Sequence, residues 1–271
     1  MTSTAILTDV TRCIGCEECV AACRITNRTG SDAPYRWQGG VNDLSSTRWT
    51  TMVETSNRHV RLHCRHCLDP ACAAACPVGA LSKTESGAVA YNPVICMGCR
   101  YCMVACPFGM TRYEWESAAP RVRKCILCAE KIAAGEIDQP ACTEACPTRA
   151  TIFGDREELL AEARSRIAAA PGRYIDHIWG EHEIGGTSVL YISDVNLAEA
   201  GWPVQLGTEA RPVLARTVLH TVPYSVFGVA GLMYGVHWPL ERRRKVAAAK
   251  AGETPPIERT EDRTAAGEEE S

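Results

Sequence analysis

The chain has 271 residues, a formal net charge of −3 and sixteen cysteines, and its length allows one or two domains. The near-neutral charge argues against a nucleic-acid-binding protein, which would carry a basic excess. Sixteen cysteines are far more than packing requires, so the chain is a disulfide scaffold, a zinc protein or an iron–sulfur protein.

The cysteines fall into four groups of four, with none left over. The groups are Cys13, Cys16, Cys19 and Cys23; Cys64, Cys67, Cys72 and Cys76; Cys96, Cys99, Cys102 and Cys106; and Cys125, Cys128, Cys142 and Cys146. Disulfides between such close neighbours would close almost no loop and stabilise little. Paired C-x2-C motifs can form a zinc site, and the fourth group can be read that way. The C-x2-C-x2-C-x3-C spacing of the first and third groups favours iron–sulfur clusters.

This spacing has a geometric reason. A cysteine at every third residue lets one loop reach three corners of a cubane, with backbone N–H groups directed at the sulfides. The fourth cysteine of such a run ligates the other cluster of a pair, and proline follows it in three of the four groups here. Sixteen thiolates at four per cubane predict four [4Fe–4S] clusters in two cross-ligated pairs.

The cysteine-rich stretches also carry a family resemblance. They are CIGCEECVAACR, HCRHCLDPACAAACPVGAL, CMGCRYCMVACPFGMTRYEW, KCILCAEKI and ACTEACPTRATIFGDREELLAEA. From Thr8 to Val195 the chain resembles the four-cluster electron-transfer subunits of formate dehydrogenase, dimethyl sulfoxide reductase and membrane-bound [NiFe] uptake hydrogenase, with the HybA-like hydrogenase type most similar. The resemblance implies an α+β fold of tandem bacterial-ferredoxin-like [4Fe–4S] domains.

The resemblance further implies which cysteines share a cluster, because the first group pairs with the fourth and the second with the third. Set 1 is then Cys13, Cys16, Cys19 and Cys146; set 2 is Cys23, Cys125, Cys128 and Cys142; set 3 is Cys64, Cys67, Cys72 and Cys106; and set 4 is Cys76, Cys96, Cys99 and Cys102. No ligand is missing, so four four-iron cubanes are expected.

Between the first two cysteine groups, residues 31–60 are predicted to be a hairpin insertion that covers a cluster. Residues 49–54 alternate weakly, as a strand does, and residues 38–40 (Gln-Gly-Gly) predict a turn. The aromatic side chains of Tyr35, Trp37 and Trp49 are expected to serve as core and cover, with electron transfer toward a partner as the alternative.

After the last cysteine group, Asp155 followed by REELLAEARSRIAAA predicts an N-capped helix that ends at Pro171-Gly172. Residues 187–195 predict a strand after the Gly185-Gly186 turn. We therefore expect a cluster domain over residues 1–155 and a helix–strand extension over residues 156–212.

The next segment predicts a single transmembrane anchor over residues 213–240. Residues 217–240 contain no Asp, Glu, Lys or Arg, and about 20 helical residues span a bilayer core. Its alternative is a buried core helix. His220 and His237 lie within residues 213–240 and are expected to be interfacial, with a haem or quinone contact in a partner as the alternative.

The tail, residues 241–271, is rich in Ala and Glu and is predicted to be disordered and cytoplasmic.

The basic residues flanking the anchor predict its orientation. Two precede the uncharged stretch over residues 217–240 and five follow it, namely Arg211 and Arg216, then Arg242, Arg243, Arg244, Lys245 and Lys250. The C-terminus is then cytoplasmic and the cluster domain periplasmic. No apolar signal region precedes Cys13, so we expect export together with a signal-bearing partner. A cluster domain at the cytoplasmic face is the alternative.

Taken together, these features predict an electron-transfer subunit that is not an enzyme alone. The sequence shows no nucleophile–base set, no dinucleotide fingerprint and no flavin motif. The resemblance implies a catalytic partner, either a [NiFe] hydrogenase or a molybdenum or tungsten enzyme such as formate dehydrogenase. It also implies a quinone-reactive or cytochrome b partner in the lipid bilayer. A zinc-stabilised interaction scaffold is the rival from another class.

Overall fold

The computed structural model describes residues 3–30, 43–55, 57–115, 117–118, 120–203 and 205–251, without the side chains of residues 213–223. The chain divides into two compact units, Met1–Leu214 and Ala215–Ser271. The strands are β1 (Thr4–Asp9), β2 (Thr50–Glu54), β3 (His59–His63), β4 (Leu81–Lys83), β5 (Val89–Tyr91), β6 (Arg112–Tyr113), β7 (Val122–Arg123), β8 (Thr151–Asp155) and β9 (Val189–Ile192). The α-helices are α1 (Glu18–Asn27), α2 (Ala71–Ala74), α3 (Tyr101–Ala105), α4 (Ala129–Ala133), α5 (Ala141–Glu144), α6 (Arg156–Ala169) and α7 (Arg211–Ala251), and short 3-10 helices cover Val10–Arg12, Glu183–Gly185 and Leu197–Ala200.

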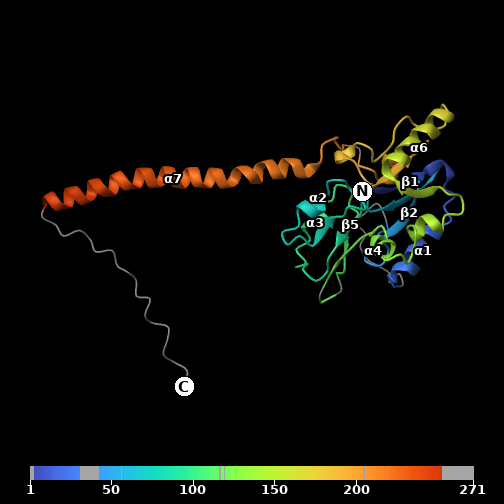
Figure 1. Cartoon of the computed structure of the whole chain (residues 1–271), viewed down its shortest axis with the longest axis horizontal. Helices are drawn as coiled ribbons and strands as arrows, with labels where there is room; N and C mark the ends of the chain where they lie inside the picture. Colours follow the sequence, from blue (N-terminus) through green and yellow to red (C-terminus); the bar gives the residue numbers. More distant parts are fainter. Residues whose placement is uncertain are drawn as a thin grey trace, which may run out of the picture. The chain divides into compact units, whose positions relative to one another are not determined.

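A three-stranded sheet lies between helix α6 and the cysteine-bearing segments of the first unit (Figure 1). Strand β1 lies in its centre, antiparallel to β8 and parallel to β9. Because side chains alternate along a strand, Ala5 and Leu7 pack on the α6 side, whereas Ile6 packs with Cys19 and Cys142. Residues 156–212 therefore belong to the same compact unit as the cysteine groups, and α6 packs on that unit as a surface helix.

Helix α6 forms as predicted after Asp155. The Asp155 carboxylate accepts the backbone N–H of Glu157 at 2.9 Å and that of Glu158 at 3.2 Å, which satisfies two donors that a helix start leaves open. Leu159 and Leu160 face the sheet and are buried. The strand predicted within residues 187–195 is confirmed as β9.

A hairpin of β2 and β3 leads directly into the second cysteine group. The two strands pair antiparallel, with Thr50 opposite His63, and Cys64 follows at once. The predicted strand at residues 49–54 is confirmed, but the hairpin extends beyond residue 60 because β3 supplies its second strand. The predicted turn at residues 38–40, with Tyr35 and Trp37, lies outside the described residues.

The remaining elements of this unit are short and serve the cysteine groups. Hairpin β4–β5 connects the second group to the third, and hairpin β6–β7 connects the third to the fourth. Helix α1 packs against α5, and helix α2 packs against α3. Mixed helix and strand content agrees with the α+β class predicted from the sequence.

The second unit holds most of helix α7. Residues 241–251 are rich in Ala, Arg and Lys, which are strong helix formers, and Lys245 Nζ lies 2.7 Å from Glu241 Oε1. The helix therefore continues through Ala251, and the disorder predicted from residue 241 is wrong up to that residue. Residues 252–271 lie outside the described part.

The apolar side chains of α7 from Tyr224 to Trp238 are exposed in the isolated chain. His237 Nε2 lies 3.3 Å from Glu241 Oε2, while the His220 side chain is outside the described set. Within the described residues, no helix combines the length and the apolar character that crossing a bilayer requires. The anchor over residues 213–240 stays a prediction.

Candidate iron–sulfur centres

Four short helices each position two cysteines that are four residues apart. The pairs are Cys19 and Cys23 on α1, Cys72 and Cys76 at α2, Cys102 and Cys106 at α3, and Cys142 and Cys146 at α5. Since α1 packs on α5 and α2 on α3, the first cysteine group meets the fourth and the second meets the third. One helical turn thus directs one thiol to each of two neighbouring sites.

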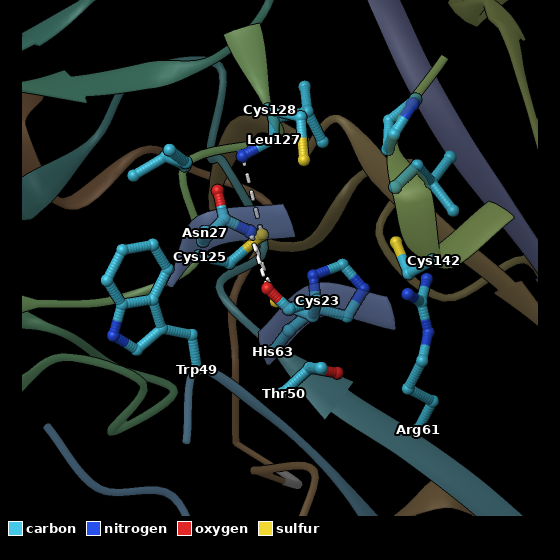
Figure 2. A pocket seen from close by; sticks show the side chains of 13 residues that line it. Cys23, Asn27, Trp49, Thr50, Arg61, His63, Cys125, Leu127, Cys128 and Cys142 are labelled. Atoms are coloured by element: carbon cyan, nitrogen blue, oxygen red, sulfur yellow. Dashed lines mark hydrogen bonds between the residues drawn. The ribbon is translucent and has the colours of Figure 1, made fainter. Parts of the chain in front are cut away.

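The thiols predicted as set 2 line one pocket (Figure 2). Cys23, Cys125, Cys128 and Cys142 come from three different segments, and Trp49 and His63 of the hairpin line the same pocket. The hairpin therefore covers this group of cysteines. The described residues of the predicted insertion thus lie over one set of thiols.

The thiols of set 4 line a second pocket, to which Cys76, Cys96, Cys99 and Cys102 all contribute. The other two sets are brought together as electrostatic neighbours. In set 1, Cys13 interacts with Cys16 and Cys146, and Cys19 interacts with Cys13 and Cys146; in set 3, Cys67 interacts with Cys64, Cys72 and Cys106. Every cysteine that the sequence selected is thus close to its expected partners, and the assignment of each as a cluster ligand stays a prediction.

The four sets also adjoin one another in numerical order. A cysteine of each set interacts electrostatically with a cysteine of the next. The three links are Cys19 to Cys142, Cys125 to Cys64, and Cys72 to Cys102. Sets 1, 2, 3 and 4 therefore form a connected series.

Left-handed backbone residues give the cysteine loops their shape. The residue before the second cysteine of each group has positive φ, with values of 73° at Gly15, 49° at His66, 72° at Gly98 and 57° at Leu127. Successive N–H groups in such turns point to one side and form a concavity that suits an anion. The same curve recurs in all four groups, although glycine occupies only two of these positions.

Backbone N–H groups are also directed at cysteine sulfur. Ala80 N lies 3.1 Å from Cys76 Sγ, and Met110 N lies 3.4 Å from Cys106 Sγ. Among the described residues, no three Cys, His, Asp or Glu side chains are placed to hold a single metal ion. Four thiols around a pocket with N–H groups at the sulfurs are the donor set of a four-iron cubane, so the residues fit that group.

Burial governs the acidity of these thiols. Burial, with a smaller contribution from neighbouring thiols, raises the pKa of Cys23 and of Cys72 to about 12. Cys146 differs, because its burial, which raises the pKa, is outweighed by the backbone N–H groups of Thr148, Ala150 and Thr151 and by the Thr148 hydroxyl, and its pKa is lowered. Metal ligation requires the thiolate, so loading such thiols with iron releases protons.

Two polar residues on strand β3 belong to the site and were missed by reasoning from cysteine spacing. Arg61 and His63 are almost fully buried, and none of their side-chain nitrogens has a hydrogen-bond partner among the described residues. Both line the pocket of set 2. The signal in the sequence is the alternation His59, Arg61, His63 immediately before Cys64, which puts three polar side chains on one face of a strand.

Two further cations, the buried Arg65 and the half-buried Lys83, lie near thiols of set 3. The Arg65 guanidinium lies over the rings of Tyr191 and Trp202, 4.6 and 4.5 Å from their centroids. Lys83 Nζ donates to the His66 carbonyl at 2.9 Å, and burial lowers its pKa to about 8 against the opposing effect of nearby thiols. The site thus contains fixed positive charge beside the thiols.

The two ends of the series reach the surface. Cys16 of set 1 and Cys99 of set 4 are the thiols classed as exposed among the sixteen. Apolar side chains near Cys99 are exposed too, including Met97 at 65% and Val104 at 88%. These two ends are where a partner protein can approach the thiols most closely.

Comparison with known proteins agrees with this geometry. Residues 57–156 match the 4Fe-4S dicluster domain family. The chain is 39% identical to a protein of Nitratidesulfovibrio vulgaris over 264 residues, which cover 93% of this chain and 70% of the relative. It is 34% identical to the hydrogenase-2 operon protein HybA of Escherichia coli O157:H7, over 81% of this chain and 78% of the relative.

A third relative is the iron–sulfur subunit of the nitrate-inducible formate dehydrogenase of Escherichia coli. It is 35% identical over 201 residues, which cover 69% of this chain and 67% of the relative. The chain therefore belongs to the family of iron–sulfur electron-transfer subunits that includes HybA and the formate dehydrogenase iron–sulfur subunits.

Proposed function

We propose that this chain holds four [4Fe–4S] clusters in a row and relays electrons between a catalytic subunit of the uptake [NiFe] hydrogenase type and a quinone-reactive subunit in the membrane. The observation that carries the proposal is that all sixteen thiols fall into four adjoining sets of four. The clusters would supply one-electron storage at iron. The chain's own residues supply the thiolates, the N–H groups at sulfur and the cover that excludes water.

The surface supports transfer at the ends of the series. Cys16 and Cys99 are exposed, whereas Cys64 and Cys142 in the two middle sets are buried. A cluster near the surface is accessible to a redox partner, while a buried one exchanges electrons with its neighbours. We assign sets 1 and 4 as the points at which electrons enter and leave.

Metal analysis of the anaerobically purified chain, with visible spectroscopy, tests the cofactor. Four cubane clusters predict about sixteen irons per chain and a brown absorption that dithionite bleaches. Each purification step in air would lower the iron content and the brown absorption together. A colourless protein that contains zinc in place of iron would refute the proposal and favour the zinc-stabilised scaffold.

The identity of the catalytic partner is a separate question. The similarity to HybA spans 81% of this chain and that to the formate dehydrogenase subunit spans 69%, which favours the hydrogenase type. A formate dehydrogenase or related molybdenum or tungsten enzyme is the second candidate. In the isolated complex, bleaching by hydrogen but not by formate would support the first candidate, and the reverse would support the second.

Membrane attachment is part of the same proposal. The uncharged stretch over residues 217–240 and the five basic residues after it support a single anchor with a cytoplasmic C-terminus and a periplasmic cluster domain. Export with a signal-bearing partner would follow, and location at the cytoplasmic face is the alternative. Protease accessibility of the cluster domain in intact spheroplasts distinguishes the two.

A further inference from the structure

Arg61 lies between the first two sets of thiols. It stands on strand β3 opposite Met52 of β2, and its side chain extends toward Cys142 (Figure 2). The groups that interact most with its charge include Cys142 of set 2 and Cys19 of set 1. Its charge also acts on Cys13 of set 1 and Cys23 of set 2. One guanidinium is thus an electrostatic neighbour of both sets.

The surroundings of Arg61 leave it without a protein counter-ion. Its side chain is 1% exposed, and within the described part of the chain the guanidinium has no nitrogen or oxygen partner and contacts the Cys142 thiol. Burying a guanidinium without a partner is strongly destabilising, as the removal of one member of a buried ion pair shows. A site that keeps such a group needs an anion there.

Other buried cations of the site are partnered, which sets Arg61 apart. Arg65 contacts the Tyr191 hydroxyl and stacks on aromatic rings, and Lys124 Nζ donates to the carbonyl of Val89. His63, beside Arg61, is held neutral by burial and by the charges of Arg61 and Arg65, which lower its pKa. Arg61 is therefore the cation that faces thiols without another partner, among the buried cations described.

We propose that Arg61 is the shared counter-charge of the clusters held by sets 1 and 2 and that it raises the reduction potential of both. The inference rests on the proposed cluster sets. Reduction adds one negative charge to a cluster whose four thiolates already make it anionic, and a fixed positive charge in a buried site stabilises that added electron. Because Arg61 faces two sets, its removal affects two clusters at once, whereas sets 3 and 4 respond less.

The test compares midpoint potentials in redox titrations followed by paramagnetic resonance. Arg61→Met removes the charge, Arg61→Lys keeps it, and Arg58→Met removes an arginine from the same hairpin at a surface position paired with Asp194. We expect Arg61→Met to shift the reduction equilibrium of two clusters at least tenfold toward the oxidised form. For a one-electron couple, a tenfold shift lowers the midpoint potential by 59 mV. Arg61→Lys should restore most of that shift, and Arg58→Met should cause none.

Two results would overturn the inference. The first is an Arg61→Met chain with its full iron content and unchanged potentials. The second is loss of the set 1 and set 2 clusters in both Arg61 variants, which would mean that the shape of arginine and not its charge is required. If only Arg61→Met loses them, retention in Arg61→Lys supports the counter-charge. A wild-type chain that lacks sixteen irons would refute the four clusters themselves, so the two failures are distinguishable.

Discussion

At the residue scale, Gly98 shows how tightly the loop before Cys99 packs against Tyr113. Its φ is 72°, and its carbonyl accepts the Tyr113 hydroxyl at 3.1 Å. A Cβ at this position would lie 2.6 Å from the same hydroxyl oxygen. Gly109 also has positive φ, but a Cβ there would meet nothing within 4 Å. The two glycines therefore separate backbone strain from steric contact.

We expect Gly98→Ala to destabilise the loaded protein more than Gly109→Ala does. The left-handed backbone costs roughly 1–2 kcal/mol in either variant, but only the Gly98 change also displaces the buried Tyr113. Thermal unfolding under anaerobic conditions measures both, with Gly109→Ala as the matched control. Equal losses in the two variants would show that the contact with Tyr113 contributes nothing.

The sequence predicts some residues of the site and not others. All sixteen cysteines were predicted as ligands because cluster ligation follows a local spacing. Leu127 and His66 adopt left-handed backbone where glycine is usual, and nothing in their side chains announces it. Arg61 was not predicted because its burial depends on how a distant loop packs over β3, although the alternation in HVRLH placed it on one face.

At the element scale, hairpin β2–β3 is the cover of set 2, and an ion pair fixes it to the sheet. Arg58 Nε donates to both Asp194 carboxylate oxygens, at 2.9 and 3.0 Å, just beyond the end of β9. The hydrogen bond from Arg58, opposed by partial burial, lowers the pKa of Asp194. The pair joins residues 136 positions apart, so it holds the hairpin to the sheet that contains β1 and β9.

Asp194→Asn should lower the free energy of unfolding by roughly 0.2–1 kcal/mol, since both side chains are partly exposed and screened. The folded pKa lies below the unfolded value of about 3.9, so this contribution is present above that value and is lost only as the pH falls through the folded pKa. The difference between wild type and variant should therefore be constant from about pH 6 to about pH 8 and should shrink in high salt.

Denaturant unfolding of the loaded protein at low and high salt measures this difference. Arg12→Met is the control, because Arg12 pairs with Asp9 at 3.4 Å and its side chain is 45% exposed. A difference that varies between pH 6 and 8 would mean that a group other than Asp194 titrates with folding.

Among the elements, helix α6 and strand β9 could be predicted because the N-cap and the β-branched run are local signals. The hydrogen bonding of β9 to β1 joins Thr8 to Tyr191, and no local pattern reports such a distant pairing. The end of α7 could not be predicted, because helix formers without an apolar face also occur in disordered segments. Propensity and (i, i+4) pairs are sufficient to extend an existing helix for three turns.

At the scale of the whole molecule, the proposed attachment to the membrane depends on residues from Arg216 onward. A chain truncated before Arg216 should be released from the membrane fraction, because it lacks the uncharged stretch and the basic residues after it. A chain truncated after Ala251 is the control and should stay bound. Retention of the shorter chain after carbonate washing would mean that contacts with partner subunits hold it there.

The cross-ligated order of the four sets is the central proposal for this molecule, and serine variants test it directly. Cys146 follows helix α5 yet lies with Cys13 and Cys19 of the first group. Paramagnetic resonance of the reduced protein should therefore show that Cys146→Ser perturbs the same cluster signal as Cys16→Ser, and not the signal that Cys125→Ser perturbs. If Cys146→Ser instead alters the cluster affected by Cys125→Ser, the fourth group binds its own cluster and the proposed order of the sets is wrong.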